Sequence, residues 1–289
     1  MNTTSTTVVS TKALLSGWER ALLLLPALAG LFFGFAPLFF PVMFANLIQF
    51  PAESLYVYQL AGAATLGYGV TLCIGLFQKA WLPLRLPVAG VLVFNLASLY
   101  ACAASIYDHQ APFSVFVVLC TSVLFVVITS LLLIRHRSAP RPDFYRPSGL
   151  LRVGLIIGGL SAAIFGLVPL VLPGPFFPLF PFQMGVTGIA RQAGAACLGY
   201  AALSLLVQQG IDRREIPLSA IMAAVFNGCS GLMSIPYLLA GKIFLLPWII
   251  VPVGLAALVI SLFILRSAFL YKVPAQVAAA PAEQLHSLT

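Results

Sequence analysis

Eight stretches of the chain are each long and apolar enough to cross a membrane as a helix. Crossing the hydrocarbon layer takes about 20 predominantly apolar residues. The stretches cover roughly residues 21–41, 56–77, 86–106, 112–134, 153–173, 187–208, 216–239 and 245–267. Their apolar runs are continuous, whereas a membrane β-barrel shows alternating segments of about ten residues. The sequence therefore predicts an all-α integral membrane protein with eight transmembrane helices.

Composition agrees with this prediction. Of the 289 residues, 61% are hydrophobic and only 8% are charged, and the mean hydropathy is +1.05. Soluble domains carry about 25% charged residues. The eight stretches leave little chain for a soluble domain, so the lipid bilayer is the expected surroundings of most of the protein.

The distribution of basic residues predicts the orientation of the helices. Lys and Arg near helix ends resist translocation and stay in the cytoplasm. With eight crossings, all but two of the 15 basic residues fall on one side, the exceptions being Arg191 and Lys242. Both termini are therefore expected in the cytoplasm, with the protein in the plasma (inner) membrane. The net charge of +8 then reflects topology and attraction to anionic lipid headgroups, and not nucleic-acid binding.

The two halves of the sequence resemble each other. The segment FGFAPLFFP, which starts at Phe33, recurs as FGLVPLVLP 132 residues later, at Phe165. At the same offset, AGAATLGY at Ala61 matches AGAACLGY at Ala193 in seven of eight positions, and VFNLAS at Val93 resembles VFNGCS. The chain therefore reads as a tandem duplication of a four-helix unit.

An even number of helices in each unit sends both copies into the membrane in the same direction. The expected fold is two parallel tandem four-helix repeats related by a pseudo-twofold axis along the membrane normal. The predicted organisation is a cytoplasmic N-terminal tail (1–19), repeat 1 (20–135), a basic cytoplasmic linker (136–151), repeat 2 (152–267) and a cytoplasmic C-terminal tail (268–289).

The repeated Gly and Pro motif at the end of the first and fifth stretches has two interpretations. Paired helices kinked at proline could frame a cavity on the symmetry axis, or the motif could simply end a span and turn the chain. After the first stretch, residues 42–50 lack proline and are expected to form a short interfacial helix. After the fifth, residues 173–183 contain four prolines and are expected to lie irregularly at the interface.

Small residues recur every four positions in the second and sixth stretches, for example at Ala61, Thr65 and Gly69. Such spacing lets helix backbones approach closely in lipid. It favours tight helix packing, either within the chain or at the face of a homo-oligomer or membrane partner.

Polar residues near the middle of the third and seventh stretches are the main candidates for a ligand site. Asn95 and Ser98 lie on one helix face, and Asn227 and Ser230 are their equivalents in the second copy. An unpaired amide in hydrocarbon costs several kcal/mol. These side chains therefore form either interhelical hydrogen bonds or a polar pocket between the repeats.

Arg191 is a charged residue inside a predicted span, close to its outer end, and its equivalent in the first copy is Gln59. Such an arginine can extend to the headgroups. It could instead pair with Glu53, or bind an anionic headgroup or substrate.

Recognisable catalytic and cofactor motifs are absent from the sequence. The three histidines fall in predicted loops or tails, no predicted span contains Asp or Glu, and the five cysteines lack metal-site spacing. No metal, cofactor or catalytic residue is therefore predicted. The adjacent Asp108 and His109 form one acid and base pair without a nucleophile.

The favoured hypothesis is a non-enzymatic polytopic protein that binds or passes a small apolar or amphiphilic ligand between its repeats. Its predicted polar contacts are Asn95, Ser98, Asn227, Ser230, Arg191 and Gln59. The alternative is a structural or assembly subunit that docks a partner through its small-residue helices. A membrane enzyme acting through Asp108 and His109 is the least favoured hypothesis.

Overall fold

The computed structural model describes residues 14–49, 55–141, 143–172, 187–241 and 245–270. Its helices are α1 (Gly17–Phe39), α2 (Pro41–Ile48), α3 (Leu55–Gln78), α4 (Trp81–Tyr107), α5 (Phe113–Arg135), α6 (Gly149–Val171), α8 (Gly188–Gln208), α9 (Ile216–Leu239) and α10 (Leu245–Leu270). Strands β1 (Phe144–Tyr145) and β2 (Ile211–Asp212) pair antiparallel, and β2 continues into the short 3₁₀ helix η2 (Arg213–Glu215).

Eight of the helices are long and apolar enough to span a membrane, as predicted. The short α2 occupies the place where an interfacial helix is expected after the first span. It follows a backbone break at Phe40, and Pro41 opens it, where the missing N–H of proline is harmless. The proline-rich segment 173–183 lies outside the described residues.

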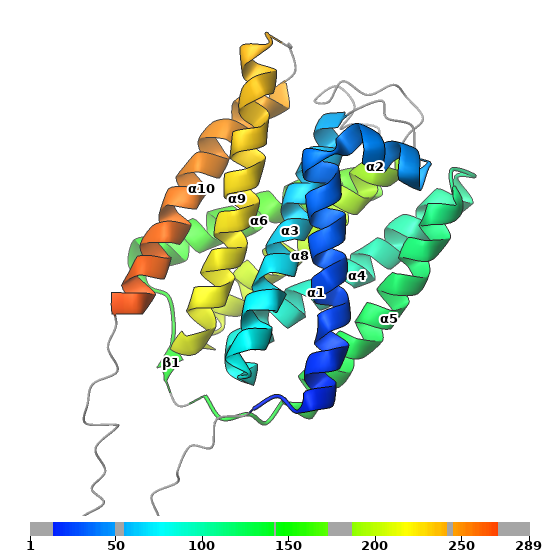
Figure 1. The fold of residues 1–289 in the computed structure, drawn as a ribbon. Coiled ribbons are helices and arrows are strands. Elements are labelled where there is room, and N and C mark those ends of the chain that lie inside the picture. The colour runs from blue at the N-terminus through cyan, green and yellow to red at the C-terminus, as the bar shows by residue number, and fades with distance from the viewer. Residues whose placement is uncertain (1–13, 50–54, 142, 173–186, 242–244, 271–289) are drawn as a thin grey trace, which may run out of the picture.

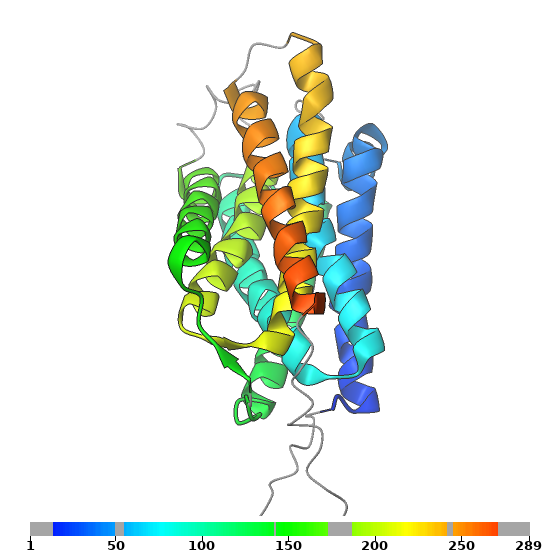
Figure 2. The same cartoon turned by 90° about the vertical axis from the view of Figure 1, so that its left-hand side faces the viewer.

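The helices form two layers that combine both halves of the chain (Figures 1 and 2). One layer runs α1, α3, α9, α10, and the other runs α5, α4, α8, α6, as the helix contacts establish. In contacts between the two halves of the chain, α4 packs mainly on α8, and α9 packs mainly on α3. Each layer therefore joins two helices of the N-terminal half to two of the C-terminal half.

The two layers meet at the centre of the bundle through a reciprocal contact between α3 and α8. The Tyr68 hydroxyl donates to the Ala196 carbonyl at 2.8 Å, and the Tyr200 hydroxyl donates to the Ala64 carbonyl at 2.8 Å. The two rings lie 4.8 Å apart between their centroids. Both hydroxyls are thus satisfied inside the protein, as a polar group at membrane depth requires.

Glycines make this contact possible. A Cβ atom added at Gly67 would collide with the Tyr200 hydroxyl, and one added at Gly199 would collide with the Tyr68 hydroxyl. Elsewhere on α3, a Cβ at Gly69 would lie 2.5 Å from the carbonyl carbon of Gly30 in α1. These small residues of α3 and α8 are therefore used in packing within the chain.

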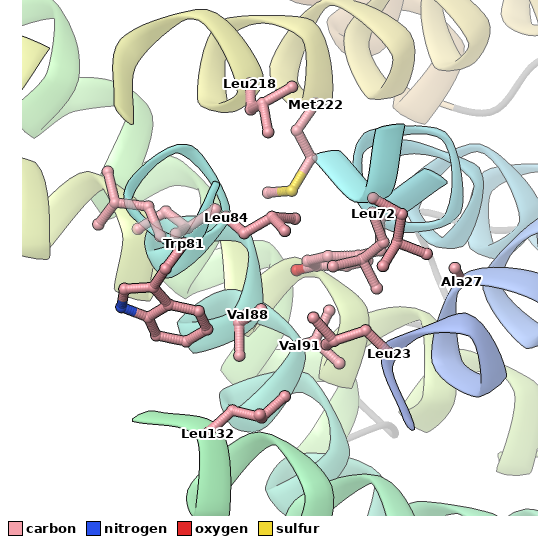
Figure 3. Close-up of a cluster of buried hydrophobic side chains, with 14 of the residues drawn as sticks. Leu23, Ala27, Leu72, Trp81, Leu84, Val88, Val91, Leu132, Leu218 and Met222 are labelled. Atoms are coloured by element: carbon pink, nitrogen blue, oxygen red, sulfur yellow. The ribbon is translucent and has the colours of Figure 1, made fainter. Parts of the chain in front are cut away.

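The largest apolar cluster includes Tyr68 and Tyr200 of this crossing and joins helices from both halves (Figure 3). Its buried members include Leu23 and Ala27 of α1, Leu72 of α3, Trp81, Leu84, Val88 and Val91 of α4, Leu132 of α5, and Leu218 and Met222 of α9. Large apolar side chains of α5, α6 and α10 are instead exposed on the outside of the bundle. This surface suits contact with a lipid bilayer.

One end of the bundle, here called the basic end, carries most of the helix termini that are rich in arginine (bottom of Figure 1). There Glu19, in the first turn of α1, is only 1% exposed. Its carboxylate accepts the Ser16 amide at 2.7 Å and lies 2.8 Å from His136 Nε2 and 2.9 Å from Arg135 Nε. Helix α1 begins at Gly17, before the predicted start at residue 21, so Glu19 lies within the helix. Its buried carboxylate ties the end of α5 to the start of α1.

Asp212 is a second buried acid at the basic end. It is fully buried and accepts hydrogen bonds from the Arg214 side chain and amide and from the Asp143 amide. Burial by itself raises the pKa of the Asp212 carboxyl, but these hydrogen bonds outweigh it and hold the pKa below the ordinary value of 3.8. The charged carboxylate therefore stabilises the turn between α8 and α9.

We expect Gly199→Ala to lower stability by about 1–3 kcal/mol, because the added methyl group must displace Tyr68. Thermal unfolding in mild detergent, followed by size-exclusion chromatography, measures the effect. The matched control is Gly158→Ala on α6, where an added Cβ has no atom within 4 Å. Equal unfolding midpoints for the two variants would contradict the close approach of α3 and α8.

Asp212→Asn should destabilise the protein by about 1–3 kcal/mol at pH 7. The pKa of the Asp212 carboxyl is lower in the folded protein than in the unfolded chain. Its stabilisation is therefore present above the ordinary pKa and is lost as the pH falls through the pKa of the folded protein. The difference between wild type and variant should therefore shrink below about pH 4, in unfolding midpoints measured across pH. Asp143→Asn is the control, because that carboxylate is 41% exposed and lies 3.4 Å from Arg213. A difference that does not depend on pH would refute the assigned role.

Candidate functional site

The two predicted asparagines are not hydrogen-bonded to each other. Asn95 Nδ2 donates to the Val91 carbonyl at 2.8 Å, and Asn227 Nδ2 donates to the Ala223 carbonyl at 2.8 Å. Each amide thus bonds to its own helix, one turn back, and the two bonds are equivalent in the two halves. Ser230 also bonds within its helix, donating to the Asn227 carbonyl at 3.2 Å.

Ser98 belongs to a buried polar group between helices. Its hydroxyl donates to Gln192 Oε1 of α8 at 2.8 Å and accepts a hydrogen bond from Ser122 of α5 at 3.0 Å. Gln192 Nε2 donates in turn to Cys102 Sγ at 3.3 Å. Polar side chains from three helices are thus connected where the surrounding residues are apolar.

Arg191 continues this group toward the end of the bundle opposite the basic end. It is 8% exposed, and its Nη1 lies 2.6 Å from Asp108 Oδ2, at the C-terminal cap of α4. The alignment is not that of a hydrogen bond, and Nε has no hydrogen-bond partner among the described residues. The alternative partner Glu53 lies outside the described part of the chain, and the observed ion pair is with Asp108.

We call the group formed by Asp108, Arg191, Gln192, Ser98, Cys102 and Ser122 the α4/α8 seam. Its members lie between α4 and the helices on either side of it, α8 and α5. Since α4 and α8 run in opposite directions, the seam leads from the charged pair at the helix ends to the buried hydroxyls of Ser98 and Ser122. Polar and ionisable groups at membrane depth commonly mark ligand or ion pathways.

A second polar group, the α3/α9 seam, lies in the other layer. Gln59 accepts a hydrogen bond from the Tyr237 hydroxyl at 2.8 Å and donates to the Leu38 carbonyl at 3.2 Å. The hydroxyls of Tyr56 and Ser234 are 2.7 Å apart. This seam contains amide and hydroxyl groups without charge, although Gln59 occupies the position equivalent to Arg191.

The predicted residues thus divide between the seams and the helix backbones. Ser98 and Arg191 lie in the α4/α8 seam and Gln59 in the α3/α9 seam, whereas Asn95, Asn227 and Ser230 bond to their own helices. Sequence reasoning missed Gln192, although a glutamine inside an apolar span is itself a signal; Gln59 was named only as the equivalent of Arg191. Ser122 and Tyr237 carry no comparable signal, because serine and tyrosine are ordinary residues of membrane helices.

A buried ion pair holds the other end of α4. Arg85 Nη2 lies 2.6 Å from Glu215 Oε2, and the glutamate side chain is fully buried at the end of η2. Glu215 Oε1 has no hydrogen-bond partner in the described part of the chain. Helix α4 is therefore linked by charge to the C-terminal half at both of its ends, through Arg85 and through Asp108.

The two residues of the acid and base pair suggested for an enzyme lie in different surroundings. The Asp108 carboxylate contacts Arg191, and His109 is exposed in the turn that follows α4, with a φ of 57°. Within the described ranges, no group of three or more His, Cys, Asp or Glu side chains could hold a metal ion.

Comparison of the chain with models of known protein families, with curated proteins and with solved structures gives no match. A function for this chain is therefore inferred from the geometry of the two seams.

Arg85→Met should lower stability by about 3–5 kcal/mol, because it leaves the Glu215 carboxylate buried without its cation. The double variant Arg85→Met with Glu215→Leu should recover most of the loss, since both charges are then removed. Thermal unfolding of the purified protein in detergent tests this. A double variant no more stable than the single one would contradict the assigned pairing.

Proposed function

We propose that this polytopic membrane protein is non-enzymatic and binds or passes a small amphiphilic ligand at the polar seams between two parallel four-helix repeats. The observation that carries the proposal is the α4/α8 seam, in which the Asp108–Arg191 ion pair and the hydrogen-bonded group of Gln192, Ser98 and Ser122 meet at adjacent positions of α8. It offers polar contacts to a headgroup beside helices whose outer faces are apolar.

Four features that recur in both halves of the chain support the tandem repeat. The hydrogen bonds of Tyr68 and Tyr200 are equivalent at the sequence offset of 132, and so are those of Asn95 and Asn227. The chain also breaks in the same way after α1 and α6, with φ values of −128° at Phe40 and −126° at the equivalent Leu172. Helix contacts follow the same pattern, since α1 packs on α3 as α6 packs on α8.

The seams are better ligand sites than the symmetry axis itself. At the axis, the rings of Tyr68 and Tyr200 pack against each other and against Phe94 and Phe226. Stability alone gives a weak reason to keep polar groups in the seams, because hydrogen bonds between membrane helices average only about 0.6 kcal/mol. Binding of a ligand with a polar head gives a stronger reason to keep polar groups in the seams.

Orientation follows from the charge asymmetry. We propose that the basic end faces the cytoplasm of a plasma (inner) membrane, because basic helix ends resist translocation. The α4/α8 seam then begins at the outer surface. The small residues of α3 and α8, which suggested an assembly subunit, have neighbours within the chain, so these residues do not favour that alternative.

Gln192→Leu should remove most of the ligand that copurifies with the protein, because it deletes both hydrogen bonds at the centre of the α4/α8 seam. Mass spectrometry of molecules extracted from the detergent-purified protein gives the measurement. Gln209→Leu is the matched control, since that glutamine is exposed at the end of the same helix.

A parallel Gln59→Leu variant reports on the second seam. Loss of ligand in Gln192→Leu alone assigns the site to the α4/α8 seam, and loss in Gln59→Leu alone assigns it to the α3/α9 seam. Wild-type protein that carries no specific ligand, or full retention in both variants, would contradict the proposed function.

A further inference from the structure

We infer that Arg191 binds the carboxylate or phosphate group of an anionic amphiphile, which takes the place of Asp108 at the outer end of the α4/α8 seam. The inference depends on the proposed function and narrows its ligand to a class. It concerns the headgroup site at Arg191 alone and holds whether or not the ligand moves further along the α4/α8 seam.

Arg191 has unused capacity to bind an anion. A guanidinium group has five N–H donors arranged in a fork that matches the two oxygens of a carboxylate or phosphate. Here Nη1 contacts Asp108 Oδ2 at 2.6 Å without hydrogen-bond alignment, and Nε lacks a partner among the residues described. Because the residue is only 8% exposed, water does not satisfy these donors well. A better aligned anion would gain charge-assisted hydrogen bonds here.

Asp108 can leave the pair at lower cost than Arg191. Its side chain is 32% exposed, against 10% for the arginine, and it lies at the cap of α4, where the chain turns. A released Asp108 carboxylate can be solvated by water, whereas Arg191 stays buried and needs an anion. The ion pair thus acts as an internal competitor that a ligand anion replaces.

Two neighbouring features suit the same headgroup. Arg191 lies in the first turn of α8, and the partial positive charge of a helix N-terminus favours anions. Gln192 Nε2 donates to the thiol sulfur of Cys102, which is a weak acceptor, so an oxygen of the ligand would be a better partner.

The surroundings favour an anion attached to a hydrocarbon chain over a free one. Beyond Arg191, the same face of α8 continues with Ala195 and Leu198, which belong to a buried apolar cluster with Ala101 of α4 and Leu170 of α6. Leu96, on the same part of α4, is half exposed on the outside of the bundle. A hydrocarbon chain can lie against the exposed apolar face of α4 at Leu96 and Tyr100 while its headgroup is at Arg191.

Equilibrium binding to the full chain in phosphatidylcholine nanodiscs tests the inference with three probes. Oleate supplies a carboxylate on a hydrocarbon chain, monoolein supplies the chain without charge, and inorganic phosphate supplies an anion without the chain. Oleate should bind more tightly than monoolein, and phosphate should not compete. Arg191→Gln should weaken oleate binding about tenfold or more and leave monoolein binding unchanged.

Asp108→Asn gives the second readout, which a purely structural ion pair would not produce. Removing the competing carboxylate should strengthen oleate binding about tenfold, as expected for the loss of one charge-assisted contact. Oleate should also raise the unfolding temperature of Asp108→Asn more than that of the wild type, because it restores an anion to Arg191. This readout keeps the inference testable even if Arg191→Gln fails to fold.

The outcomes separate the inference from the proposed function. Equal affinities for oleate and monoolein in wild type and in both variants would overturn the anionic headgroup but leave an amphiphile site. Competition by inorganic phosphate at the affinity of oleate would overturn the requirement for a hydrocarbon chain. Absence of specific binding of every probe would overturn both proposals.

Discussion

The crossing of α3 and α8, held by the two tyrosine hydroxyls, is the contact on which the rest of the bundle depends. Each hydroxyl must find an acceptor inside the protein, because the bilayer interior offers none. Each reaches a carbonyl of the opposite helix only because glycine stands where a side chain would block it, at Gly67 and Gly199. The crossing therefore fixes both the distance between the helices and their register.

The packing of the remaining helices around this crossing produces the seams. With α3 and α8 in contact at the centre, α9 packs on α3 and α4 packs on α8, so each interface joins different halves of the chain. Polar residues that would face lipid in a separate four-helix unit instead face a helix of the other half. This is why amides and hydroxyls gather at two related places, and why a ligand bound there would contact both halves.

The two seams differ in charge, and the difference lies in a few residues. At equivalent positions one half has Gln59, bonded to Tyr237, and the other has Arg191, paired with Asp108. A neutral seam can be satisfied by its own hydrogen bonds. A buried arginine needs an anion, and this requirement is the physical basis for the proposal that an anionic headgroup binds in the α4/α8 seam.

The sequence by itself determined the number of spanning helices, because a membrane helix requires a long apolar stretch that local composition reveals. It also identified Arg191, since one charge inside an apolar span is conspicuous. Only the tertiary structure decided that α4 lies on α8, that Asn95 bonds to its own helix, and that Glu19 and Glu215 are buried. Partner choice depends on how side chains interlock between helices distant in sequence, and hydropathy carries no information about that fit.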